Sequence, residues 1–315
     1  MKKLIALFAT LALPLLCAAQ LRKDDNTVAI VAYWHPGDEV VLQSAMTRKQ
    51  VSEDGSEFVN AQAVQTITLK VLEETETTYT VRISYSNVLD SATEGSIANE
   101  VSSAITSNMS YEIITNQFGQ VQQIANAEQN LKAMRDKIPG LVDGVLARYD
   151  KKTIVEQGVD RDDYVKRFQG VFEDVAFISK NYNIYLLPLF RFHGNRFALD
   201  REYADEVTFY NVLDRGTLDL DMTYYFDSEE TDAHSTLVES IAEADKEQMK
   251  PFAEALGMDD VDMTMQEVSS LTINLDTGWP DDLYNIRTVH LVDKETGEKM
   301  DLVWETGLTD SRNIE

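Results

Sequence analysis

The chain has 315 residues and carries 28 lysine and arginine residues against 54 aspartate and glutamate residues, a net charge of −26 at pH 7. So acidic a surface excludes nucleic acid and anionic lipid headgroups as partners, because both are bound through positive side chains. The only cysteine is Cys17, which excludes an intrachain disulfide. The composition is typical of a soluble acidic protein that attracts cations or a basic partner.

The first residues have the layout of a secretory signal peptide: two lysines, an uncharged apolar run over 4–16, and small residues around the cleavage point. The run of 13 residues is shorter than the roughly 20 that a membrane-spanning helix needs. Leu16 stands before Cys17, where bacterial lipoprotein signals have glycine or alanine, and this disfavours lipid attachment. We expect residues 1–19 to be removed, leaving 20–315 without a transmembrane span in the periplasm or outer envelope of a Gram-negative bacterium, or secreted.

Residues 20–315 are expected to form a single β-rich domain. Six prolines and 14 glycines are few for this length, and no stretch has the glycine-, serine- or proline-rich composition of a linker. A chain of this size can bury a large core.

Two segments of the first half alternate strictly between apolar and polar residues, which predicts strands with one buried face. The first, 59–71, would extend over roughly 43 Å at ~3.3 Å per residue, and strands of that length must bend. The apolar positions of the two segments are Val59, Ala61, Ala63, Ile67, Leu69 and Val71, and Tyr79, Val81, Ile83 and Tyr85.

A hairpin and a helix follow. The segment 109–124 predicts a hairpin with its turn at 116–119. Asn126, with Gln129 three residues later, suggests a capping box, and apolar residues then recur at helical spacing. Pro139 is expected to kink or split this helix.

A second helix is predicted to begin near Asp160. The second half returns to strands, with alternation over 218–226, and then a helix over 232–256 that is kinked near Pro251 and stopped at Gly257. Three further strands are expected at 268–275, 284–292 and 299–304, with a polar turn over 293–299 between the last two.

The order of strands, helices, strands, helix and strands predicts an α+β fold. The long alternating strands favour a strongly curved antiparallel sheet or an incomplete β-barrel. The helices of 126–179 and 232–256 are expected to pack on one face of it.

The stretches "HPGDEVVLQSAMTRKQV", "QAVQTITLKVLEETETTYTVRISYSNV" and "YEIITNQFGQVQQIANAEQ" resemble exported Gram-negative envelope proteins of unassigned function, over roughly residues 33–130. More distantly, the predicted architecture is similar to periplasmic half-barrel lipoprotein carriers, which hold acyl chains between a curved sheet and covering helices. This resemblance implies carriage of an apolar ligand, and it transfers no individual site residue.

The sequence contains no nucleophile elbow, zinc-protease helix, phosphate loop or dinucleotide-binding glycine pattern. The four histidines, His35, His193, His234 and His290, show no metal-ligand spacing. We expect His290 to be a core histidine, because it falls on the same side of the strand as the apolar residues Tyr284, Ile286 and Val292. For His234, we favour a helix start flanked by acidic residues over a zinc or calcium site.

The densest carboxylates are Asp219 with Asp221, and Asp259 and Asp260 with Asp262. Calcium binding by such a pair is one interpretation, and a solvated strand face is the one we favour. A glycosidase would need two carboxylates about 5–10 Å apart across a substrate, and the sequence singles out no pair. We therefore predict no catalytic residue, no metal and no cofactor.

The segment 183–197, "NIYLLPLFRFHGNRF", is apolar and aromatic but alternates poorly, and Pro188 excludes it from a central strand. It is either a connection buried under the helices or the lip of an apolar cavity. Under the second hypothesis, the ligand-binding residues are Tyr185, Leu187, Phe190, Phe192 and Phe197.

Three functions are compatible with these observations. The first is a non-enzymatic envelope protein that binds or carries a lipid or other apolar ligand between sheet and helices. The alternative is a structural protein that binds another envelope protein through a sheet edge or its acidic face. The third is a carboxylate-based hydrolase.

Overall fold

The computed structural model describes residues 21–90, 96–173, 186–213 and 216–313. The expected signal peptide and Tyr185 lie outside these ranges. Within them, eleven antiparallel strands form one unclosed sheet with the order β7-β6-β5-β4-β3-β14-β13-β12-β11-β10-β9. The bounds are β3 (Glu39–Ser52), β4 (Glu57–Glu74), β5 (Thr78–Asp90), β6 (Ser110–Asn116), β7 (Val121–Ala125), β9 (Tyr203–Val212), β10 (Gly216–Asp227), β11 (Ser235–Ala244), β12 (Val261–Asn274), β13 (Pro280–Asp293) and β14 (Lys299–Asp310).

Two meanders make up this sheet. Strands β3 to β7 pair in sequence order, and so do β9 to β14. The meanders join where β14 pairs with β3, in a register that sets Thr306 opposite Met46. The α+β class and the antiparallel sheet predicted from the sequence are confirmed.

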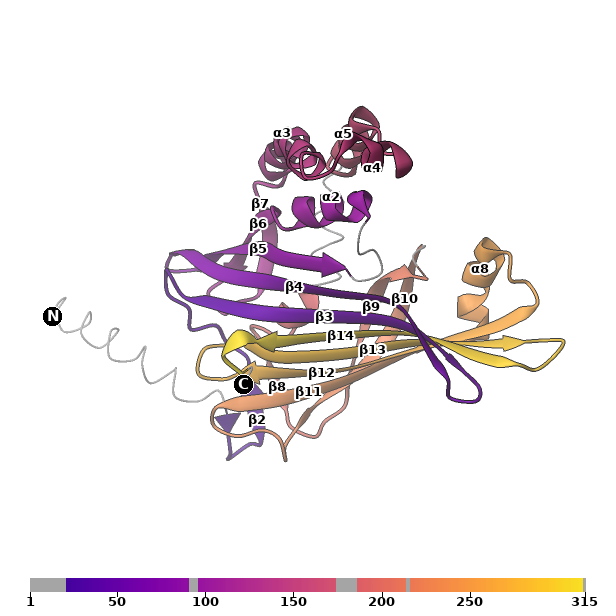
Figure 1. Ribbon diagram of the computed structural model, residues 1–315. Helices are drawn as coiled ribbons and strands as arrows, with labels where there is room; N and C mark the ends of the chain where they lie inside the picture. Colours follow the sequence, from indigo (N-terminus) through magenta and orange to yellow (C-terminus); the bar gives the residue numbers. More distant parts are fainter. Residues whose placement is uncertain (1–20, 91–95, 174–185, 214–215, 314–315) are drawn as a thin grey trace.

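A second, three-stranded sheet and the helices complete the described fold (Figure 1). In Figure 1, α2 to α5 gather over β5–β7, while α8 lies apart, against β12. The small sheet comprises β1 (Leu21–Arg22), β2 (Thr27–Ala29) and β8 (Arg196–Ala198), and the helices are α2 (Ile97–Thr106), α3 (Ala127–Leu146), α4 (Lys151–Glu156), α5 (Arg161–Val171), α7 (Leu187–Phe190), α8 (Lys246–Leu256) and the 3-10 turn Ser311–Asn313.

The sheet is strongly curved, as its long strands predicted. Strand β4 has 18 residues, and its ladders are interrupted by bulges between Val64 and Thr66 and between Val71 and Glu73. Bulges bend a strand and increase its twist. The sheet rolls so far that Arg287 on β13 reaches the backbone of Tyr210 on β9, although three strands lie between them in the sheet order.

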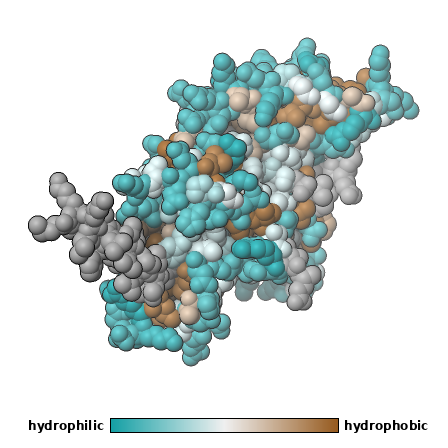
Figure 2. Space-filling view, turned by 90° about the vertical axis from the view of Figure 1, so that its left-hand side faces the viewer, coloured by the Kyte–Doolittle hydropathy of each residue, from teal (hydrophilic) through white to brown (hydrophobic). Residues whose placement is uncertain are grey.

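The core lies on the concave face of this rolled sheet. The alternation predicted for β5 is confirmed, because Tyr79, Val81, Ile83 and Tyr85 are all buried. The polar residues of the other parity remain on the outer side. Figure 2 shows one side of the molecule, where hydrophilic residues predominate and the hydrophobic ones form separate patches. This distribution agrees with the acidic composition.

The hairpin predicted around 116–119 is confirmed. Strands β6 and β7 flank a turn in which the Asn116 side-chain oxygen accepts hydrogen bonds from the backbone N–H groups of Phe118 and Gln120, both at 3.0 Å. Gly119 has a φ of 89°, the left-handed region that favours glycine. A Cβ at Gly119 would stand 2.6 Å from the ring of His193, so the hairpin tip packs against the segment that follows α7.

Some of the helix starts predicted from the sequence are confirmed, and others are wrong. Asp160 caps α5 by accepting from the N–H groups of Asp162 and Asp163. Helix α3 begins at Ala127 and runs through Pro139 as one element. The capping box at Asn126 was wrong, because Asn126 is left-handed (φ 51°) and its side chain makes no capping bond. Helix α2 was not predicted.

The helix expected over 232–256 was wrong in its first half. Residues 235–244 form β11, whose alternating Thr236, Val238, Ala242 and Ala244 are buried against the core. The helix begins only at Lys246, after a capping box between Asp245 and Gln248, and it ends at Gly257 (φ 69°) as predicted. Pairing along all ten residues of β11 with β12 overrides the helix propensity of its alanine and glutamate residues.

Candidate functional site

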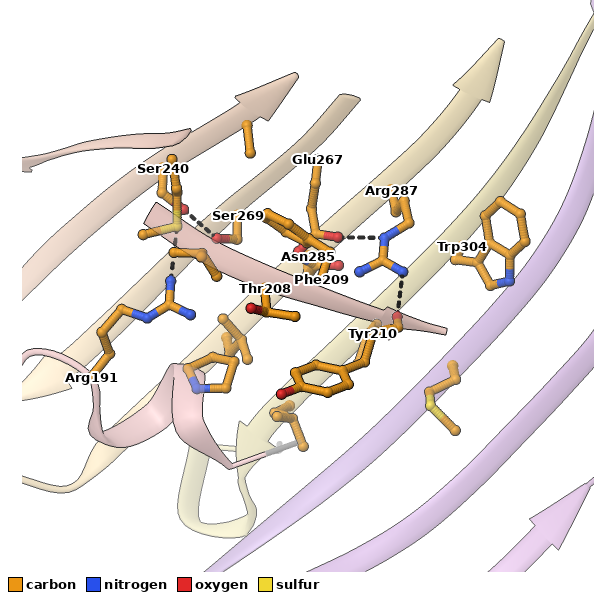
Figure 3. A pocket seen from close by; sticks show the side chains of 18 of the residues that line it. Arg191, Thr208, Phe209, Tyr210, Ser240, Glu267, Ser269, Asn285, Arg287 and Trp304 are labelled. Atoms are coloured by element: carbon orange, nitrogen blue, oxygen red, sulfur yellow. Dashed lines mark hydrogen bonds and ion pairs between the residues drawn. The ribbon is translucent and has the colours of Figure 1, made fainter. Parts of the chain in front are cut away.

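The candidate site is a cavity of about 260 Å³ on the concave face. Figure 3 shows β9, with Thr208, Phe209 and Tyr210, crossing over the strands that carry Ser269, Asn285 and their neighbours. The short helix α7 closes one side through Pro188 and Arg191. The rolled edge of the sheet therefore forms a roof, and β11 to β14 with β3 form the floor.

Apolar side chains make up much of this wall. They come from β3, β14 and β13 on one side and from β9, β10, β11 and helix α7 on the other. The apolar lining residues are Met46, Pro188, Val207, Phe209, Met222, Ala242, Leu283, Trp304 and Leu308.

A band of polar side chains crosses the floor. Strand register sets Ser240 opposite Ser269, Ser269 opposite Asn285, and Asn285 opposite Thr306. The adjacent row sets Glu267 opposite Arg287. We call the six residues Ser240, Glu267, Ser269, Asn285, Arg287 and Thr306 the polar band.

The polar band interrupts a face that is apolar on both sides of it. Toward one end of the strands, the same face carries the facing residues Val238, Leu271 and Leu283. Toward the other end, it carries Met265 opposite Val289. Polar groups inside an apolar surface cost stability unless they are hydrogen-bonded, so their placement at the cavity needs a chemical reason.

Glu267 is the centre of the polar band. Its carboxylate accepts hydrogen bonds from Asn285 Nδ2 at 2.9 Å and from Arg287 Nε at 2.5 Å. Both charged side chains are largely covered, with 16% of Glu267 and 19% of Arg287 exposed. Such charge-assisted bonds compensate for the removal of the two charges from water.

Arg287 also fixes the roof of the cavity. Its Nη1 donates to the carbonyl oxygen of Tyr210 at 3.1 Å, and its guanidinium lies 5.6 Å from the ring centre of Phe209. A cation over an aromatic ring is an attractive arrangement. One side chain thus joins the floor, through Glu267, to the edge strand β9.

Two further contacts stiffen the walls. The hydroxyl groups of Ser240 and Ser269 share a hydrogen bond of 2.6 Å. On the far wall, the guanidinium of Arg48 lies 5.1 Å from the ring centre of Trp304. These contacts hold a hydroxyl pair and an aromatic ring in place before any ligand arrives.

The wall nearest α7 carries the positively charged side chain of Arg191. Arg191 Nη1 lies 2.8 Å from Met222 Sδ. Behind it, burial raises the pKa of Tyr224 to about 12, with Asp205 adding to the rise and Arg191 opposing it. Asp205 and Arg191 thus act in opposite directions on the same phenol.

The four predicted ligand-binding residues that the structure describes, Leu187, Phe190, Phe192 and Phe197, do not line the cavity. Leu187 is half-buried on α7, and Phe190, Phe192 and Phe197 are buried. Phe190 packs against Trp34 and His193, with ring centres 6.0 Å and 5.6 Å apart. Pro188 and Arg191, from the same segment, line the cavity instead. Ligand binding by Tyr185, Leu187, Phe190, Phe192 and Phe197 stays a prediction.

His290 corrects the histidine prediction. Its side chain is 45% exposed, and Nδ1 lies 2.8 Å from Asp301 Oδ1. The buried positions of β13 have the opposite parity and include Leu283, Val289 and Leu291. The fully buried histidine is His193, whose Nε2 lies 2.7 Å from the carbonyl oxygen of Gly278.

The carboxylates singled out from the sequence make ordinary surface contacts. Asp219 accepts from the hydroxyl of Thr208 at 2.5 Å, and Asp262 accepts from Lys246 Nζ at 2.6 Å. The helix start expected at His234 is wrong, because strand β11 begins at Ser235; His234 instead lies 2.8 Å from Asp276, which raises the pKa of this histidine. Among the described residues, no cluster of three or more histidine, cysteine, aspartate or glutamate side chains is placed to hold a metal ion. No described helix has the length and apolarity required to span a bilayer.

The chain matches no protein-family model, and no curated protein sequence matches it. Among solved structures, one that reports lipid–protein interactions in lipovitellin is 8% identical with a TM-score of 0.38, and the alignment covers 88% of this chain and 25% of that one. The attachment invasion locus protein Ail of Yersinia pestis is 5% identical with a TM-score of 0.15, covering 87% and 99%. This chain thus spans about a quarter of the lipovitellin chain, and at these TM-scores neither likeness assigns a function.

Proposed function

We propose that the protein is a non-enzymatic envelope protein that binds a small, mainly apolar ligand in the cavity beneath β9. The observation that carries this proposal is the open space of about 260 Å³ on the concave face of the sheet. Protein interiors are close-packed and leave few voids larger than a water molecule. A cavity of this size, bordered by fixed polar groups, is a feature of ligand sites.

The volume limits the size of the ligand. An engineered apolar cavity of about 150 Å³ takes up benzene, as established for another protein. Sites for drug-sized ligands begin at roughly 300 Å³. The cavity therefore suits one or two rings or a short acyl segment, and a longer chain would have to project from it.

The apolar wall supplies the affinity. Burial of apolar ligand surface contributes roughly 25 cal/mol per Å². Phe209, Met222 and Leu308 would contact such a surface from three strands. The two methionines of the wall, Met46 and Met222, add flexible side chains that adapt to the ligand shape.

Native mass spectrometry of the protein from its own host tests the proposal. We expect a co-purified small molecule that is lost in Ala242→Phe, because this residue lines the cavity, and retained in Ile241→Phe. Ile241 is the adjacent residue of β11, points to the outer face and is 39% exposed. Equal ligand content in both variants, or none in the wild type and no uptake of added octan-1-ol, would refute the proposal.

A further inference from the structure

We propose that the ligand carries an uncharged hydrogen-bonding group, a hydroxyl or a primary amide, which lies on the polar band. This inference rests on the proposed function and names the chemical class of its ligand. The argument comes from the charges and the remaining hydrogen-bonding capacity of the cavity floor.

The charges of the floor are already compensated. Glu267 and Arg287 form a close ion pair, and Asn285 donates to the same carboxylate. A ligand carboxylate placed on the band would stand beside that of Glu267, and like charges repel strongly where water is excluded. A ligand ammonium would meet the same obstacle from Arg287.

The hydrogen-bonding capacity of the floor is not exhausted. Within the described part of the chain, the Asn285 side-chain oxygen and the Thr306 hydroxyl have no hydrogen-bond partner. Ser240 and Ser269 share a single bond, which leaves one hydroxyl hydrogen to donate. Acceptors and donors thus alternate over a short distance along one row.

A hydroxyl or amide group matches this pattern, because each donates and accepts at once. A purely apolar ligand would remove water from the band and leave these groups without partners, which costs affinity. Sites built to bond a polar group reject analogues that lack it. The band therefore selects for a neutral amphiphile, with its apolar body against Met222, Phe209 and Leu308.

Calorimetry with three eight-carbon ligands tests the inference. The ligands are octan-1-ol, octanoate and n-octane, the last supplied as a saturated solution, and all are measured in the same buffer at pH 7.4. We expect octan-1-ol to bind at least tenfold more tightly than octanoate and n-octane. Thr306→Val removes one hydroxyl from the polar band. This variant should lower the affinity for octan-1-ol severalfold and leave the affinity for n-octane unchanged. Thr309 lies on the outer face of the same strand, so Thr309→Val should change neither of these affinities.

The outcomes separate this inference from the proposed function. Octanoate or n-octane binding as tightly as octan-1-ol would overturn the inference while the cavity remains a ligand site. Glu267→Gln provides a second measurement, because removal of the carboxylate charge should raise the affinity for octanoate relative to octan-1-ol. An unchanged ratio in that variant would also contradict the inference. If none of the three chains binds the wild type, the proposed function fails, and the inference fails with it.

Discussion

Arg287 and Tyr210 join two strands that the sheet order separates by three others. Nη1 of Arg287 on β13 donates to the carbonyl oxygen of Tyr210 on β9 at 3.1 Å. The same guanidinium is paired with Glu267 beneath the cavity. One side chain thus links the edge strand of the rolled sheet, which forms the roof of the cavity, to a covered carboxylate on the cavity floor.

Replacement of Arg287 by methionine should destabilise the protein by about 2 kcal/mol, because Glu267 and the Tyr210 carbonyl lose their charged donor. Urea unfolding gives the change in free energy. Hydrogen exchange should accelerate in β9 before the rest of the sheet. Arg82→Met is the matched control, since Arg82 pairs with Glu112 and is 49% exposed, and such pairs contribute at most about 1 kcal/mol. Equal losses in the two variants would contradict the role given to Arg287.

Stability should fall with acidification because of His193. Burial lowers its pKa from the ordinary 6.5 of histidine to about 4, so the folded state holds the neutral imidazole. The contribution is complete above pH 6.5 and is lost as the pH falls toward 4, with roughly 3 kcal/mol at stake. His193→Gln keeps a hydrogen-bond donor for the Gly278 carbonyl, and the glutamine side chain does not ionise over this pH range. The difference in unfolding free energy between wild type and variant should therefore shrink between pH 7 and pH 4.5, and a constant difference would refute this assignment.

Gly278 should tolerate no side chain. It has a φ of 78°, and a Cβ there would stand 2.4 Å from the carbonyl oxygen of Val31. Gly297 has a φ of 75° but nothing within 4 Å. Gly297→Ala should lower the free energy of unfolding by about 1 kcal/mol, from backbone strain alone. Gly278→Ala should lower it clearly more, and thermal or urea unfolding of the two variants measures the difference. Similar costs at the two sites would show that Val31 does not pack closely against this turn.

Phe190 should behave as a core residue. It is 2% exposed and lies edge-on to Trp34 at 6.0 Å. Phe190→Ala should lower the free energy of unfolding by about 3–5 kcal/mol, and Phe190→Asp should prevent folding at 37 °C. A melting temperature that stays near the wild-type value in Phe190→Asp would contradict this packing and restore Phe190 as a candidate ligand contact.

The strands were the most predictable part of the fold. Alternation located β5 and β10 because one side of each strand packs on the core and the other meets water. The same signal was present in β11 at Val238, Ala242 and Ala244, but acidic residues and alanines at helical spacing masked it. The pairing of β3 with β14 had no local signature, because it joins residues far apart in the chain, such as Thr306 and Met46.

Residues of the polar band stand out in the sequence because they are polar at positions where the alternation of the strand predicts buried apolar residues. Glu267 and Ser269 share the parity of Met263, Met265 and Leu271, so two polar residues interrupt a buried row. Asn285 and Arg287 interrupt the buried row of β13 in the same way. The meaning of these exceptions depends on two facts that no local pattern contains, the register between β12 and β13 and the passage of β9 above them.

Methionine-methyl NMR tests the central claim, ligand binding in the cavity, most directly. Met46 and Met222 line the cavity. Met249 is buried on α8 and Met263 is buried near the start of β12, and neither of them lines the cavity. In a titration with octan-1-ol, we predict saturable shifts of the Met46 and Met222 methyl signals, assigned by Met46→Leu and Met222→Leu, with those of Met249 and Met263 unchanged. Signals of Met46 and Met222 that stay in place, or shifts spread evenly over all four methyl groups, would contradict the account.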